Sequence, residues 1–139
     1  MRVDCFLDTN VLVYATSSSK GDASKQNRAL KLIQHAGFGL SAQVLQEFYL
    51  TMTRKLKTPL APEMAVALMD EYRAFPMAPT DYQLIVSAAE ISVRHGISYW
   101  DGAIIAAAEI LQARVLYTED LNHGQRYGSV RVENPFRDI

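Results

Sequence analysis

The amino-acid sequence predicts an α/β domain in which helices cover both faces of a short central parallel sheet. The chain has 139 residues, a length typical of a single domain, and no repeat or linker divides it. Short apolar segments typical of buried strands alternate with longer segments of helical periodicity. Because such alternation favours parallel strands joined by helical crossovers, we expect residues 1–139 to form one three-layer α/β/α sandwich.

Five short segments are predicted strands. The first contains the only cysteine, Cys5, which is typical of a small buried side chain rather than a disulfide. The third lies between Pro76 and Pro79 and is restricted to the edge of a sheet, because proline cannot donate a backbone hydrogen bond. In chain order the predicted strands are residues 2–7, 38–41, 76–79, 115–118 and 130–133.

Six segments are predicted helices, and several have recognisable ends. Ser24 and Thr80 suit N-cap positions, and Gly96 suits a C-terminal stop. Ser98 with Asp101 three residues later resembles a capping box. A polar, serine-rich loop is expected at 16–21. In chain order the predicted helices are residues 9–15, 24–35, 43–56, 62–75, 81–95 and 98–112.

Two aspartates follow predicted strands. Asp8 comes at the end of the first strand, and Asp120 comes just after the strand at 115–118. In open α/β sheets, ligands bind beyond the carboxyl ends of the strands, where the strand order reverses. If the two strands are neighbours, both carboxylates emerge at the same edge. Taken singly, each aspartate is more typical of a turn or a helix cap.

Two further acids lie on predicted helices. Asp101 is in the first turn of a helix with almost no polar residues, so its N-terminus should open into the interior or a cleft. The alternative is that Asp101 only stabilises the helix dipole. Glu47 borders the apolar face of the helix at 43–56, although a solvated glutamate is the commoner case.

Four carboxylates that converge without a cation would be costly. Two unit charges 4 Å apart repel by about 4 kcal/mol at an effective dielectric constant near 20. The three histidines, at positions 35, 95 and 123, show no spacing typical of metal ligands. Oxygen ligands alone favour Mg²⁺ or Mn²⁺ over Zn²⁺. Such an ion can polarise a phosphodiester and lower the pKa of a bound water.

Composition indicates where in the cell the protein is located, but it does not decide whether the protein binds nucleic acid. No segment is long and apolar enough to span a membrane, and the acidic N-terminus does not resemble a signal peptide, which predicts a cytoplasmic protein. Neutralising four acids by metal would change the net charge from −1 to +3, so nucleic acid is neither favoured nor excluded. Three basic residues could contact phosphates, although cations are equally typical of a helix C-terminus: Arg54, Lys55 and Lys57. Aromatic residues that could stack on bases, although core packing is the default, are Tyr14, Tyr49 and Trp100.

The motifs around Asp8, Glu47, Asp101 and Asp120, taken in chain order and on the strands and helices predicted above, resemble those of PIN-domain ribonucleases. In size and layout the chain is similar to VapC-type toxins of bacterial toxin–antitoxin pairs. The resemblance covers essentially the whole chain. It rests on Leu7-Asp8-Thr9-Asn10-Val11-Leu12, Gln46-Glu47-Phe48, Trp100-Asp101-Gly102-Ala103-Ile104-Ile105 and Thr118-Glu119-Asp120-Leu121.

The resemblance implies a role for each acid. Asp8 and Asp101 would be the primary metal ligands, and Asp120 would complete the metal site directly or through water. Glu47 would complete the acidic pocket. The adjacent Glu119 leaves open which of the pair is the fourth acid, although the family spacing from the preceding threonine favours Asp120.

The resemblance also implies the reaction and the partners. Asn10 and Thr118 match polar residues that fix carboxylates or a water. The enzyme would be an endoribonuclease that uses Mg²⁺ or Mn²⁺ and leaves a 5′-phosphate and a 3′-hydroxyl, on a parallel sheet with the first strand central. Its expected partners are RNA, a cognate antitoxin protein and a second copy in a homodimer. The predicted helix at 62–75 has an apolar stripe that is wider than one buried face requires. This stripe is either part of the core or a surface for a partner, and it comprises Met64, Ala65, Leu68, Met69, Tyr72 and Phe75.

Three other interpretations remain. A phosphatase forming an aspartyl-phosphate on Asp8 usually has a second aspartate two residues later, where this chain has Asn10, and no lysine follows Lys57. The chain could also be a housekeeping PIN-like nuclease, or a degenerate PIN-like module that binds RNA without cleaving it.

Overall fold

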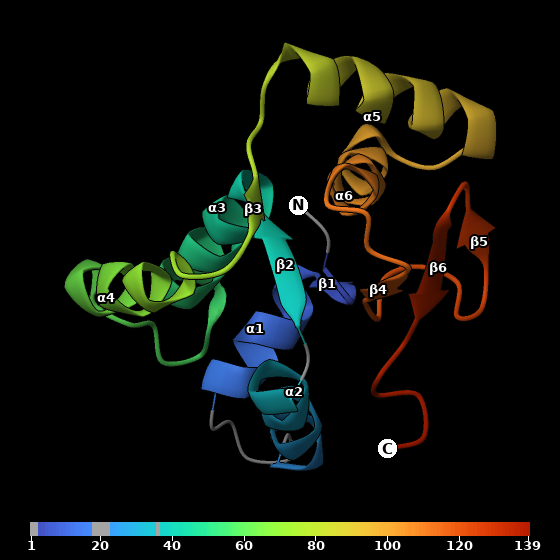
Figure 1. The fold of residues 1–139 in the computed structure, drawn as a ribbon. Coiled ribbons are helices and arrows are strands. Elements are labelled where there is room, and N and C mark those ends of the chain that lie inside the picture. Colours follow the sequence, from blue (N-terminus) through green and yellow to red (C-terminus); the bar gives the residue numbers. More distant parts are fainter. Residues whose placement is uncertain (1–2, 18–22, 36) are drawn as a thin grey trace.

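The computed structural model describes residues 3–17, 23–35 and 37–139, and within them the strands form one six-stranded sheet (Figure 1). The strand order is β3-β2-β1-β4-β6-β5, and every neighbouring pair is parallel except β5 and β6. β1 therefore lies inside the sheet, as expected. The strands are β1 (Cys5–Leu7), β2 (Phe38–Ser41), β3 (Met77–Ala78), β4 (Val115–Tyr117), β5 (Arg126–Tyr127) and β6 (Val130–Glu133).

Helices lie on both sides of this sheet, which confirms the predicted three-layer α/β/α fold (Figure 1). α6 crosses one face with α5 packed outside it, while α1 and α2 lie on the other side and α3 and α4 pack beside them. The helices are α1 (Thr9–Thr16), α2 (Ala23–His35), α3 (Ala42–Leu50), α4 (Pro62–Tyr72), α5 (Tyr82–His95) and α6 (Tyr99–Ile110), with a π-helical turn η1 (Thr51–Lys55) after α3.

The order of the strands explains where a site forms. From β1 the chain builds the sheet in one direction through β2 and β3, and it later returns to the other side of β1 through β4. Strand order thus reverses between β1 and β4. Their register pairs Leu7 with Tyr117, so the residues after these strands, Asp8 and Thr118, leave the sheet side by side.

The core is formed by the buried strands and by α6. Gly102 to Ala108 on α6 are all buried, as its apolar sequence predicted. Gly102 is needed because a Cβ there would lie 2.6 Å from the backbone oxygen of Ala88 on α5, so a side chain would push the two helices apart. Cys5 is buried and forms no disulfide, and burial raises its thiol pKa to about 11.

Three predictions about the strands and helix ends were wrong in detail. β5 was not predicted, because it has only two residues and pairs antiparallel with β6 through a turn at Gly128, whose φ is +61°. The helix predicted at 43–56 starts one residue earlier and changes to the π-helical turn at Thr51. The last long helix ends at Ile110 rather than at Gln112, whose φ of 57° is incompatible with a right-handed helix.

Two predicted caps and one predicted surface also differ. Ser24 lies inside α2 and is not its cap. Asp81, not Thr80, caps α5 by accepting a hydrogen bond from the backbone N–H of Leu84. In the apolar stripe on α4 only Met64 is exposed, at 57%, so the stripe is mainly core.

The outcome of two further predictions can be given only for the residues that the structure describes. The predicted loop at 16–21 falls partly on α1, and its residues 18–21 lie outside the described part. None of the helices in the described part has the length and apolar character that crossing a bilayer requires.

Candidate functional site

Asp8 is the buried carboxylate at the point where the strand order reverses. Its side chain is only 7% exposed, and its backbone N–H donates to the carbonyl of Tyr117 on β4 (3.1 Å). Asp8 is also the N-cap of α1, because its Oδ1 accepts a hydrogen bond from the backbone N–H of Thr9 (2.7 Å). The strand and the helix together therefore hold this carboxylate in one orientation.

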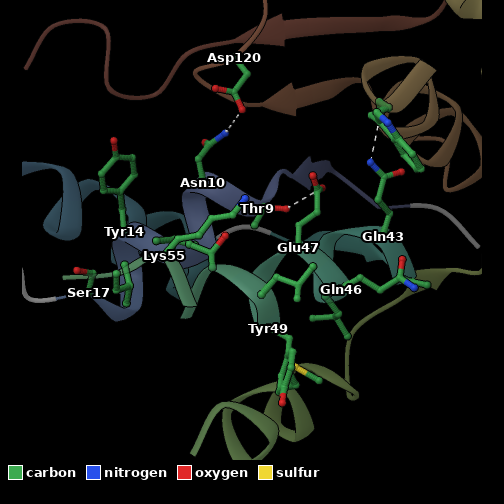
Figure 2. Close-up of a pocket in the computed structure, with 18 of the residues that line it drawn as sticks. Thr9, Asn10, Tyr14, Ser17, Gln43, Gln46, Glu47, Tyr49, Lys55 and Asp120 are labelled. Carbon is green, nitrogen blue, oxygen red and sulfur yellow. Dashed lines mark hydrogen bonds between the residues drawn. The ribbon is translucent and has the colours of Figure 1, made fainter. Parts of the chain in front are cut away.

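Thr118 connects three parts of the site through one hydroxyl group. The hydroxyl is fully buried and donates to Asp8 Oδ2 (2.8 Å). It accepts hydrogen bonds from Asn10 Nδ2 (3.2 Å) and from the backbone N–H of Asp120 (3.1 Å). The Asn10 amide also donates to Asp120 Oδ2 (3.1 Å), as Figure 2 shows. Asp8, Asn10, Thr118 and Asp120 thus form one hydrogen-bonded group.

Glu47 reaches the same region from α3. Ser41 caps this helix at the end of β2, with its Oγ accepting a hydrogen bond from the backbone N–H of Val44 (3.2 Å). The Thr9 hydroxyl donates to Glu47 Oε1 (3.2 Å), which links Glu47 to the residue after Asp8 (Figure 2). Sequence reasoning assigned no role to Thr9, although it stands within the first acidic motif.

Asp101 approaches the site from the N-terminus of α6 but is not hydrogen-bonded to the other acids in the described part of the chain. The Ser98 hydroxyl accepts a hydrogen bond from the backbone N–H of Asp101 (3.0 Å), so the predicted N-cap is correct. Desolvation first, and then the charges of Asp120 and Asp101, raise the pKa of Glu47, while hydrogen bonds from Thr9 and Gln43 lower it. The negative charge of Asp101 therefore acts on Glu47, as the charge of Asp120 does.

Burial raises the pKa of Asp8 to about 7. The hydrogen bonds from Thr118 and Thr9 oppose this shift, and the negative charges of Glu47 and Asp120 add to it. A carboxylate in this position is costly when it is ionised without a nearby positive charge. The arrangement therefore favours either a proton or a cation on Asp8 at neutral pH.

This shift predicts a pH-dependent penalty on folding in the absence of metal. Between about pH 4 and pH 7 the folded chain keeps a proton on Asp8 that the unfolded chain releases, so stability falls as pH rises through this interval. We expect the free energy of unfolding of Asp8→Asn, relative to the parent, to rise by a few kcal/mol over this interval, since one pKa unit corresponds to about 1.4 kcal/mol. Chemical denaturation in EDTA at several pH values measures it.

The substitution also has a pH-independent cost, so the slope is the informative quantity. Both Asp8 oxygens accept hydrogen bonds, one from the Thr118 hydroxyl and one from the Thr9 N–H, and an asparagine amide has only one acceptor oxygen, so one of the two bonds is lost at a cost of about 1 kcal/mol at every pH. Asp4→Asn is the matched control, because Asp4 is exposed and lies just before β1. A stability difference for Asp8→Asn that does not change with pH would contradict the assigned pKa.

Glu119 and Asp120 are neighbours with different surroundings. The Glu119 carboxylate accepts a hydrogen bond from the Tyr14 hydroxyl (2.9 Å) and forms an ion pair with Lys25 (3.5 Å). Lys25 also lies over the Tyr14 ring, 4.8 Å from its centroid. Asp120 is exposed and faces Asn10 instead. Of the two, only Asp120 is hydrogen-bonded to the group that contains Asp8.

A groove of about 1190 Å³ opens beside these residues (Figure 2). Its polar lining includes Asn10, Glu47 and Asp120, and Lys55 is the only member of the predicted basic group that lines it. Arg54 and Lys57 are exposed elsewhere. Much of the rest of the lining is apolar, including Val13, Leu45, Leu50, Leu56, Met69 and Met77. The groove therefore combines an acidic edge with an adaptable apolar wall.

Comparison with protein families gives one match across most of the chain. The model of the PIN domain matches residues 5–128, which include every acid of the site. No curated protein matches the sequence.

Several solved structures share this fold at low sequence identity to the chain. VapC20 of Mycobacterium tuberculosis, a toxin that cleaves the sarcin–ricin loop, superposes with a TM-score of 0.68 at 21% identity, over 84% of this chain and 89% of that one. FitAcB of Neisseria gonorrhoeae gives 0.65 at 21% identity, over 96% and 99% of the two chains. A toxin–antitoxin complex from Klebsiella pneumoniae gives 0.71 at 13% identity, over 95% and 98%. At these identities the likeness shows the fold.

Proposed function

The chain belongs to the PIN-domain family, and on this premise we propose that it is a Mg²⁺- or Mn²⁺-dependent endoribonuclease and the toxin of a toxin–antitoxin pair. One observation carries the proposal. The buried Asp8 carboxylate stands where the strand order reverses, with Asp120 joined to it through Thr118 and with Glu47 close enough to raise its pKa. A divalent cation would stabilise the ionised form of such a site.

The chemistry of the side chains fits a hard divalent cation. Asp8 and Asp101 are the proposed primary ligands, Asp120 completes the metal site directly or through a water, and Glu47 completes the acidic pocket; no histidine or cysteine is part of the group. Within the described residues no three acidic, histidine or cysteine side chains are close enough to hold one ion together. Mg²⁺ is usually bound by only one or two carboxylates, and waters complete its coordination. The Asn10 Oδ1 atom, buried and without a hydrogen-bond partner in the described part, is a further oxygen beside them.

The reaction that this site supports is hydrolysis of an RNA phosphodiester. A bound divalent ion would supply positive charge that polarises the phosphate and acidifies a water. In hydrolysis the water oxygen bonds to phosphorus, the bond from phosphorus to the ribose 3′ oxygen breaks, and that oxygen takes up a proton. Thr118 and Asn10 orient Asp8 and Asp120 for this task, and Lys55 offers a charge to a flanking phosphate in the same groove.

The apolar wall of the groove supports the second part of the proposal, an inhibitory protein partner. Met69 and Met77 make this wall adaptable to a partner segment, and the acids at its edge would pair with an arginine of that partner. Such an arginine would compete with the metal. A homodimer remains part of the proposal, and exposed apolar side chains on α5, such as Val93 at 85%, are available for it. We propose that the enzyme acts in the cytoplasm.

The test is cleavage of RNA by the purified full chain. We expect cleavage in Mg²⁺ or Mn²⁺, none in EDTA, and recovery when the metal is restored. Where a small open reading frame adjoins this gene, we expect its product to inhibit the reaction, and to inhibit less as Mg²⁺ increases. Gel electrophoresis of a labelled RNA measures both effects, and size-exclusion chromatography shows the complex and the oligomeric state.

The two parts of the proposal fail separately. Cleavage that continues in EDTA would remove the metal-dependent mechanism. RNA bound but not cleaved under any metal would indicate a degenerate binding module. Cleavage at the same rate with and without the neighbouring gene product would indicate a nuclease with no toxin role.

A further inference from the structure

Trp100 is an exposed aromatic side chain that the fold places beside the proposed active site. Its side chain is 65% exposed, so the default interpretation of core packing is wrong for this residue. It directly precedes Asp101 on α6 and lines the same groove as Glu47 and Asp120. Trp100 is thus an exposed aromatic surface that a ligand in this groove can reach.

Contacts on two sides hold Trp100 in place. Its carbonyl accepts a hydrogen bond from Nε2 of the buried Gln43 on α3 (3.2 Å). Its ring packs edge-to-face against Tyr99, with centroids 5.0 Å apart and planes at 82°. Tyr99 in turn packs against the core. The backbone of Trp100 is therefore fixed, and the contact with Tyr99 restricts the indole, which lowers the conformational entropy lost when a ligand binds to it.

The two ends of the groove differ in chemistry. In Figure 2, Gln43 and Gln46 lie on one side of Glu47, and Lys55 lies on the other. The exposed amide of Gln46 can donate and accept hydrogen bonds, as the edge of a nucleobase requires, whereas Lys55 offers a charge to a phosphate. A base end, an acidic centre and a phosphate end together match a nucleotide chain.

We propose that the Trp100 indole is the platform on which an unpaired RNA base stacks, next to the phosphate that is cleaved. This inference rests on the proposed function and makes it more specific. A base can lie flat on an indole only if it is free of its own stack, so the platform selects single-stranded or looped RNA over a duplex. Stacking alone accepts every base, and discrimination among bases then depends on other residues of the groove, such as Gln46.

The experiment uses the tryptophan itself as the probe. Trp100 is the only tryptophan in the chain, so its emission reports on this one position. The full chain carrying Asp8→Asn, in Mg²⁺, is titrated with a labelled single-stranded RNA of about ten nucleotides and separately with its duplex. We expect the single strand to quench the emission until the site is saturated and the duplex to leave it unchanged. Anisotropy of the labelled RNA measures binding independently.

Variants separate stacking from a structural role. We expect Trp100→Ala to weaken binding of the single strand about tenfold, within the range of one stacked base, and Trp100→Phe to weaken it less. Tyr82→Ala is the matched control, because Tyr82 is 80% exposed at the far end of α5 and does not line the groove. It should bind RNA like the Asp8→Asn chain from which it is made.

Three results would overturn the inference. RNA that binds without quenching, and that binds Trp100→Ala equally well, would remove the platform but leave the nuclease intact. Quenching that depends on protein concentration alone would assign Trp100 to contact with a second copy. An absence of any RNA binding would reject the platform, and the proposed function would fall with it only if the parent chain also cleaves no RNA in Mg²⁺.

Discussion

Replacing Asp8 with asparagine is expected to reduce RNA cleavage in Mg²⁺ by on the order of a thousandfold, equivalent to about 4 kcal/mol of transition-state stabilisation. The side chain keeps its shape but loses the charge that we propose for metal binding, at the only buried acid of the four. Asp101→Asn should have an effect of similar size. The rate of cleavage of a labelled RNA, measured at saturating metal, gives the ratio.

Three comparisons make this result interpretable. Asp4→Asn carries the same chemical change on the same segment and should retain the parent rate. Glu119→Gln should also retain most activity, because the Glu119 carboxylate is engaged by Tyr14 and Lys25, whereas Asp120→Asn should lose it. Full activity in both Asp8→Asn and Asp101→Asn would remove the catalytic assignment, whereas loss of the fold by circular dichroism would show that these acids have a structural role.

The second large effect is expected for Thr118→Val. Valine has the shape of threonine but cannot donate to Asp8 Oδ2 or accept from the backbone N–H of Asp120, and the site is fully buried. An unsatisfied buried polar group costs about 1–3 kcal/mol, and more when it is charged, so we expect a loss of about 2–4 kcal/mol in unfolding free energy. Cleavage should also fall by about tenfold to a hundredfold, because Asp8 and Asp120 lose their common orienting group.

Thr118→Ser is the matched control for this prediction. Serine keeps the hydroxyl and loses only one methyl group, which costs about 1 kcal/mol in a core. Chemical denaturation in EDTA and the cleavage rate compare the two variants. Equal stability and equal activity in Thr118→Val and Thr118→Ser would contradict the role of the hydroxyl.

The layered fold and the position of the acids follow from patterns that a sequence displays. Alternating apolar strands and helices predicted a layered parallel sheet, in which the carboxyl ends of the strands lie at one edge, and the resemblance to PIN-domain ribonucleases implied that the first strand is central. Asp8 and Asp120 could therefore be expected to meet there before their distances were known. Ser98 could be identified as a cap because the acceptor and its donor are only three residues apart.

Other features depend on contacts between distant residues, and a single sequence does not display them. The link from Thr9 to Glu47 and the group of Tyr14, Lys25 and Glu119 join residues far apart in the chain. A strand as short as β5 has no periodicity to detect. The exposure of Trp100 depends on how α6 meets α3, so its sequence environment wrongly suggested a buried residue.

The most direct test of the central claim, that these acids support hydrolysis of RNA by water with a divalent ion, is the chemical nature of the ends that the full chain leaves in Mg²⁺. Mass spectrometry of a defined oligonucleotide identifies them. Attack by water predicts a 5′-phosphate and a 3′-hydroxyl, no product in EDTA and no product from Asp8→Asn. A 2′,3′-cyclic phosphate that also forms in EDTA would show that the ribose 2′-hydroxyl is the nucleophile, and it would contradict the metal site.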